Sequence, residues 1–142
     1  MNKLILSSSV LLLLSACSKI TPVKEIAVSK TVEFSVYQAV DYSAPVYNGV
    51  EAEVRLTLGK QTSNGSEVIL WDTVIPYQSL RAYPAIQTPL RINKQFDILQ
   101  NSEQLRFGKV IRYRDALNQV SFVAIGEDIP PSVNVKVIQV DL

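Results

Sequence analysis

Apolar and polar residues alternate with a period of two along most of the chain after residue 30. The clearest run covers residues 50–58. Its apolar residues are Val50, Ala52, Val54, Leu56 and Leu58, and its polar residues are Glu51, Glu53, Arg55 and Thr57. Successive side chains of a β-strand point to opposite faces, so this period is typical of strands that bury one face. Because no segment has a strong helical period, the pattern predicts an all-β protein.

Seven segments have this strand character. They are residues 31–40, 50–58, 67–75, 90–98, 105–114, 120–125 and 133–142. Such a series predicts a single antiparallel β-sandwich with Greek-key connections, either immunoglobulin-like or transthyretin-like. Between the second and third segments, Asn64-Gly65 is a residue pair suited to a hairpin turn.

Two of the segments carry finer expectations. Residues 67–75 are apolar on both faces, as residues 120–125 are, which favours a central position in a sheet for 67–75. In residues 133–142 the apolar positions shift from odd to even numbers after Val137. One extra residue in a strand produces such a shift, so a β-bulge is expected there.

The first sixteen residues have the layout of a secretory signal. Lys3 precedes a mainly apolar run at residues 4–14, and the small residues Ser15 and Ala16 follow it. A run of about eleven residues extends only about 16 Å as a helix, roughly half of the hydrocarbon thickness of a bilayer. We therefore expect a leader that is removed rather than a transmembrane span.

The end of this leader, Leu14-Ser15-Ala16-Cys17, resembles the lipobox of bacterial lipoproteins. The resemblance covers the leader alone and implies a processing class, not a domain family. It implies cleavage before Cys17 and lipid attachment to the Cys17 sulfur. More than one acyl chain is needed for stable anchoring, because a single chain gives only marginal membrane binding.

Ser18 follows the cysteine, where an aspartate marks inner-membrane retention in Gram-negative lipoproteins. The resemblance thus implies an outer-membrane anchor with the domain facing the periplasm. In a Gram-positive host the anchor would lie on the outer face of the single membrane. The expected organisation is a signal peptide at 1–16, a lipidated tether at 17–30 and the β-sandwich at 31–142.

The composition argues against several classes of function. Cleavage removes Lys3, and the 14 basic residues become 13, which equals the 13 acidic residues. A net charge near zero disfavours nucleic acid as a partner. The chain has no histidine, which rules out Ser-His and Cys-His nucleophiles, and its five glycines form no phosphate-binding loop. We expect a protein that is not an enzyme and has no cofactor.

Charged residues offer three weaker candidates. Glu51 and Glu53 lie about 6.6 Å apart along a strand, a spacing found between glycosidase carboxylates, but they share the solvated face. Three arginines of the fifth segment also share a face, where they would dock an anionic partner or, as we prefer, pair with acids such as Glu51 and Glu53. They are Arg106, Arg112 and Arg114.

Calcium is the third candidate. Glu127-Asp128, or Asp115 with Asn118, supplies at most two ligands, and a calcium site would have to be assembled across loops. No metal site is therefore predicted from local sequence.

The connection at residues 76–89 is the favoured contact surface. It contains Tyr77, Arg81 and Tyr83 and has room for one helical turn around residues 78–82. Tyrosine and arginine are common anchors of protein interfaces. Two alternatives remain: these tyrosines, with Tyr42 and Tyr47, cap the open ends of the core, or they form a platform for sugars.

Taken together, these features predict a lipid-anchored β-sandwich of the cell envelope that acts as a non-enzymatic protein-binding or assembly module. Its expected partner is an envelope protein. The alternative is a glycan- or ligand-binding lipoprotein of an envelope or nutrient-capture system.

Overall fold

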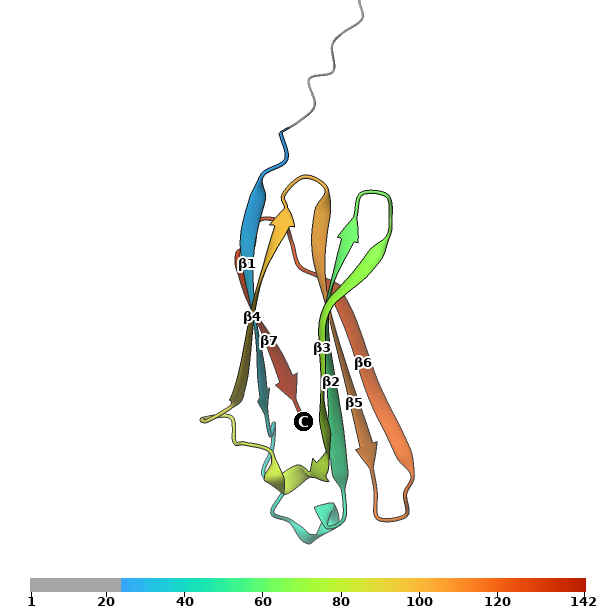
Figure 1. The fold of residues 1–142 in the computed structure, drawn as a ribbon. Helices are drawn as coiled ribbons and strands as arrows, with labels where there is room; N and C mark the ends of the chain where they lie inside the picture. The colour runs from blue at the N-terminus through green and yellow to red at the C-terminus, as the bar shows by residue number, and fades with distance from the viewer. Residues whose placement is uncertain (1–23) are drawn as a thin grey trace, which may run out of the picture.

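The computed structural model describes residues 24–142 and shows a β-sandwich (Figure 1). The strands are β1 (Ala27–Tyr37), β2 (Glu51–Thr62), β3 (Glu67–Ser79), β4 (Leu90–Leu99), β5 (Glu103–Arg114), β6 (Val120–Asp128) and β7 (Val135–Asp141). Two single 3₁₀ turns, η1 (Pro45–Tyr47) and η2 (Leu80–Ala82), lie in the connections. The all-β prediction is confirmed. The leader and Cys17 lie outside the described residues, and within residues 24–142 no helix is long and apolar enough to cross a membrane.

The strand order distinguishes between the two expected arrangements. One sheet has the order β4-β1-β7, and the other has the order β3-β2-β5-β6. All neighbours are antiparallel except β1 and β7, which are parallel. In the immunoglobulin order the first strand pairs with the second, whereas here β1 pairs with β4 and β7. The strand order therefore differs from the immunoglobulin arrangement, one of the two that the sequence predicts.

The core lies between the two sheets and is formed by the faces that the alternation predicts. The three central strands, β1, β2 and β5, each contribute buried residues to it. These residues are Val32, Phe34 and Val36 of β1, Ala52, Val54, Leu56 and Leu58 of β2, and Leu105, Phe107 and Ile111 of β5. The expected hairpin between β2 and β3 is also present, because Gly65 has a φ of 83° in the turn.

The sandwich begins earlier than the alternation indicated. Ala27 to Lys30 belong to β1 and pair with β4, so they are part of the domain rather than of the tether. Lys30 is buried, and its ammonium donates hydrogen bonds to the Pro131 carbonyl, to the Val133 carbonyl at 3.0 Å and to Asn134 Oδ1 at 2.9 Å. A lysine that satisfies its charge in this way interrupts the apolar pattern without leaving the core face. It also holds the segment that leads into β7.

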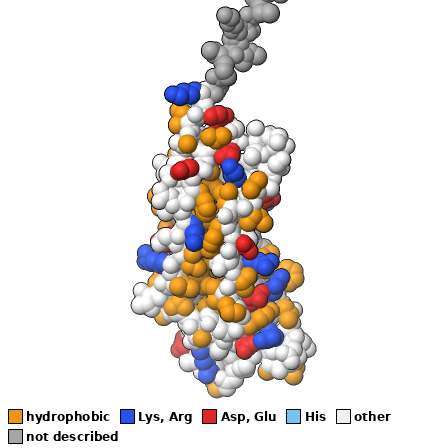
Figure 2. All heavy atoms as spheres, viewed as in Figure 1, with side chains coloured by type: hydrophobic (Ala, Val, Ile, Leu, Met, Phe, Trp, Pro, Cys, Tyr) orange, Lys and Arg blue, Asp and Glu red, His pale blue; other side chains and the backbone are white. Residues whose placement is uncertain are grey.

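The expectation that residues 67–75 form a central strand is wrong. β3 pairs only with β2 and is an edge strand, as β6 is on the other side of the same sheet. Both strands carry apolar residues on both faces, and many of these residues are exposed. Figure 2 shows how much hydrophobic surface of the domain is accessible, with charged side chains scattered among it.

The β-bulge expected in the last strand is absent from the register of β1 and β7, which runs without a shift from Val135 to Asp141. Ile138 and Val140 point inward and are buried, whereas Val135 and Val137 point outward and are exposed. The apparent change of phase therefore arises from valines on the solvent face. Val135 and Val137 are therefore exposed on β7, which is an edge strand of the three-stranded sheet.

Candidate binding surface

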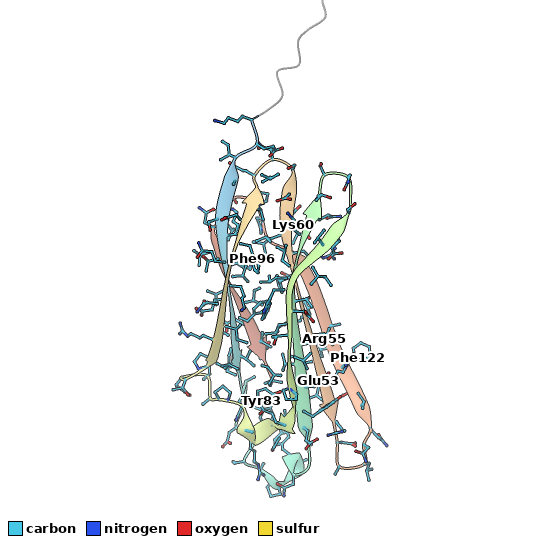
Figure 3. All side chains as sticks on the ribbon, in the orientation of Figure 1. Glu53, Arg55, Lys60, Tyr83, Phe96 and Phe122 are labelled. Carbon is cyan, nitrogen blue, oxygen red and sulfur yellow. The ribbon has the colours of Figure 1, made fainter. Side chains whose placement is uncertain are left out.

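Tyr83 lies in the core and is not part of a contact surface. Its hydroxyl donates a hydrogen bond of 2.8 Å to the Ala52 carbonyl, and the ring lies between the two sheets (Figure 3). Burial raises the pKa of the Tyr83 hydroxyl to about 12. Tyr42 is buried as well, with its ring 4.8 Å from the Tyr47 ring in an edge-on arrangement. The interpretation that the tyrosines cap the core is correct for Tyr42 and Tyr83.

Arg81 is used to hold a neighbouring connection in place. Its Nε donates to the Tyr42 carbonyl at 2.8 Å, and its Nη2 donates to the Ser43 carbonyl at 2.8 Å and to Asn48 Oδ1 at 2.7 Å. A third carbonyl, that of Ala44, accepts from the same nitrogen at 3.1 Å. With these four partners the guanidinium joins η2 to the segment around η1, which makes Arg81 a structural residue.

Tyr77 lies apart from the other two predicted contact residues. β3 extends to Ser79, and Tyr77 is therefore a strand residue, with the Arg114 guanidinium 4.3 Å from the centre of its ring. The structure does not bring Tyr77, Arg81 and Tyr83 together on the surface. Tyr83 is therefore unavailable as a contact residue because it is buried, and Tyr77 and Arg81 also make interactions within the domain. A contact through the remainder of residues 76–89 stays a prediction.

The arginines on the outer face of the four-stranded sheet are paired, as expected. Arg112 donates to Glu53 at 2.9 Å, and Arg114 is paired with Glu51. These cross-strand pairs leave little free charge for an anionic partner, and both carboxylates serve as pairing groups. Among residues 24–142, no group of three or more acidic or cysteine side chains is placed to hold a metal ion.

The most distinctive surface is the side of the sandwich where β6 and β7 meet, because one sheet has three strands and the other has four. β4 lies against β3, with Lys94 Nζ 4.9 Å from the centre of the Trp71 ring. β7 lies against β5, where Lys109 Nζ donates to the Gln139 carbonyl at 2.7 Å. Within residues 24–142, the smaller sheet has no further strand to cover β6. We call this side the open side.

Exposure of the inward-facing residues shows the effect of the missing strand. Ile111 on β5 is only 3% exposed, whereas Val123, its register partner on β6, is 48% exposed. Ile125, the partner of the buried Lys109, is 37% exposed. These residues point in the same direction from adjacent strands, so the difference arises from the missing opposite strand together with the edge position of β6.

A groove of about 190 Å³ runs along the open side, between β6 and the edge of β7. Its lining includes Phe107, Lys109, Ile125, Glu127, Lys136 and Val137. Lys109 also donates to Asp141 Oδ1 at 3.2 Å, so it ties β7 to β5 at the inner end of the groove. Burial works to raise the pKa of Asp141, but its own backbone hydrogen bond and the contact with Lys109 outweigh burial and lower it.

Sequence reasoning missed this surface, although one signal pointed to it. Residues 120–125 are apolar on both faces, which fits a central strand and an uncovered edge strand equally well. Comparison with known proteins does not add to the geometry: the chain matches no protein-family model, no curated protein and no solved structure.

The positions of Arg81 and Tyr83 lead to a stability prediction. Tyr83→Phe leaves the buried Ala52 carbonyl without its donor, so we expect a loss of about 1–3 kcal/mol in the free energy of unfolding. Arg81→Ala should also lower the melting temperature, because it frees three carbonyls of one connection. Denaturant unfolding measures both changes.

Arg91→Ala, which removes only a surface pair with Glu33, is the control and should cost under about 1 kcal/mol. If Tyr83→Phe and Arg91→Ala unfold alike, the role given to the Tyr83 hydroxyl is wrong.

Proposed function

We propose that this protein is a lipid-anchored module of the bacterial cell envelope that binds another envelope protein through its open side. The anchor is supported by the lipobox-like Leu14-Ser15-Ala16-Cys17, and Ser18 supports an outer-membrane location with the domain in the periplasm. The binding role is supported by the geometry of the open side. The proposed task is non-enzymatic, in keeping with a chain that has no histidine and whose Glu51 and Glu53 are engaged in ion pairs.

The observation that carries the proposal is the uncovered inner face of β6 beside the exposed edge of β7. Val123 and Ile125 are in the position of core residues and yet are accessible to water. An extended segment of a partner could pair with the edge of β7, become a fourth strand of the smaller sheet and cover both residues. Addition of a strand to an exposed sheet edge is a common mode of recognition, in which main-chain hydrogen bonds give affinity and alternate side chains give specificity.

The alternative, binding of a glycan or small ligand, has less support. The tyrosines expected to form a sugar platform do not provide one, because Tyr42 and Tyr83 are buried and Tyr77 is stacked against Arg114. The groove on the open side is lined by aliphatic residues and lysines, with Phe107 buried at its base. An extended peptide with apolar side chains suits this lining better than a sugar does.

The anchor can be tested at Cys17. In cells fed labelled fatty acid, the wild-type chain should incorporate the label, and Cys17→Ser should not, because the acyl acceptor is the thiol. The variant should accumulate either as an uncleaved precursor or as a protein released from the membrane. Equal labelling of both proteins would contradict lipid attachment at this residue.

The binding surface can be tested on β7, away from the anchor. Val137→Asp and Lys136→Glu alter the outward face and the groove wall, and each should cause a several-fold loss of the partner that cross-links to the full-length protein in intact cells. Val46→Asp is the matched control, since Val46 is a highly exposed valine in η1. If the wild type and the three variants recover equal amounts of a stoichiometric partner, the contact lies elsewhere. Absence of any such partner would contradict the proposed function itself.

A further inference from the structure

The outer face of β6 has a protruding aromatic residue on an unprotected edge. Phe122 is 70% exposed and points away from the smaller sheet (Figure 3). β6 contains no lysine, arginine or proline, and its only charges are Glu127 and Asp128 at its end. Natural proteins usually protect edge strands with such residues or with bulges, because a bare apolar edge pairs readily with another chain.

A hollow lies on the same face beside Gly126, four residues along the strand from Phe122. Gly126 and Gly108 are register partners on β6 and β5. A Cβ on Gly126 would make only ordinary contacts, whereas a Cβ on Gly108 would lie 2.5 Å from the Thr57 hydroxyl, which borders the hollow. The hollow has a volume of about 140 Å³ and extends from these glycines past Arg106 to Ile69 on β3. A Cβ atom on Gly126 would lie 3.9 Å from Arg106 Nε. An aromatic ring placed over Gly126 would therefore contact aliphatic surface and a guanidinium, both favourable for a phenyl group.

The sequence of β6 is complementary to itself when two copies run antiparallel about Ala124. In that register every residue from 120 to 128 has a partner, since residue 124 is the middle of the strand. Phe122 of each copy lies opposite Gly126 of the other, and Val123 lies opposite Ile125. Pairing of an aromatic residue with a cross-strand glycine is a favourable arrangement in sheets, because the ring covers the exposed glycine backbone.

Charge favours the same register. Antiparallel pairing puts Glu127 and Asp128 of one copy opposite Ser121 and Val120 of the other, so the acidic ends lie far apart. A parallel arrangement would place like carboxylates side by side, and a shift of the two-fold axis to Ile125 would put carboxylates against Phe122 and Val123. Both are unfavourable.

We propose that the protein forms a two-fold symmetric dimer in which the β6 strands of two copies pair antiparallel about Ala124 and each Phe122 occupies the hollow over Gly126 and Gly108 of the other copy. The two four-stranded sheets thereby become one continuous sheet. The edge of β7 is not used in this contact. The dimer is thus independent of the binding function proposed for the open side.

Disulfide trapping in the full-length protein tests the register. Directly opposed residues of antiparallel strands have Cα atoms about 4.5–5.5 Å apart, which a disulfide can span. Ala124→Cys should therefore give a covalent dimer after mild oxidation of intact cells. In Phe122→Cys the two thiols would be displaced by about 13 Å along the strands at about 3.3 Å per residue, so no dimer should form. Coexpressed Phe122→Cys and Gly126→Cys chains should cross-link with each other. The wild-type chain controls for Cys17.

The fit of Phe122 is tested on the Ala124→Cys background. Phe122→Ala removes the inserted ring and Gly126→Val fills the hollow, and each should cause a several-fold loss of covalent dimer while the melting temperature stays within a few degrees. Val74→Ala on β3, also an exposed apolar residue of this sheet, should leave the yield unchanged.

Cross-linking of Phe122→Cys as strong as that of Ala124→Cys would overturn the proposal, since it indicates random collision. So would the absence of cross-linking at Ala124, or a yield that does not depend on Phe122. A monomer that still captures its partner through β7 would refute the dimer and leave the binding function intact.

Discussion

The unequal width of the two sheets determines which apolar residues of this protein are buried. The same alternation runs through β5 and β6, but only β5 is covered by a strand of the other sheet. Burial of apolar surface contributes about 25 cal/mol per Å² to stability. Val123 and Ile125 do not make this contribution in full, and a further strand that covered them would add to it. The open side, the free edge of β7 and the bare β6 strand all follow from this mismatch.

The sequence predicted the faces of most strands but not how the strands pair. The alternation in residues 50–58 correctly placed Val54 and Leu56 in the core, and the polar face correctly paired Glu53 with Arg112. The edge position of β3 was missed, because apolar residues on both faces do not reveal whether a second sheet covers either one. Pairing partners are set by contacts distant in sequence, and a single strand pattern does not contain them.

The candidate site was missed for related reasons. Tyr83 and Arg81 are residue types common in interfaces, and only the structure shows that their polar atoms bind main-chain carbonyls of the same domain. Lys30 falls within the predicted tether because residues 18–30 are polar and lack a convincing period. Its three acceptors come from residues about a hundred positions away, which no local pattern reveals. The exposed valines of β7 were read as a bulge, since outward apolar residues and an extra residue give the same pattern.

The open side requires that the inner face of β6 be accessible to water, and the reactivity of single thiols tests this accessibility most directly. Val123→Cys and Ile111→Cys place a thiol on register partners of adjacent strands, one beneath no strand and one beneath β7. In the folded protein, with the reactivity of the wild-type chain subtracted, maleimide should modify Val123→Cys nearly as fast as it modifies the unfolded chain. It should reach Ile111→Cys only through unfolding. Equal protection of the two thiols would show that β6 is covered and would contradict the open side.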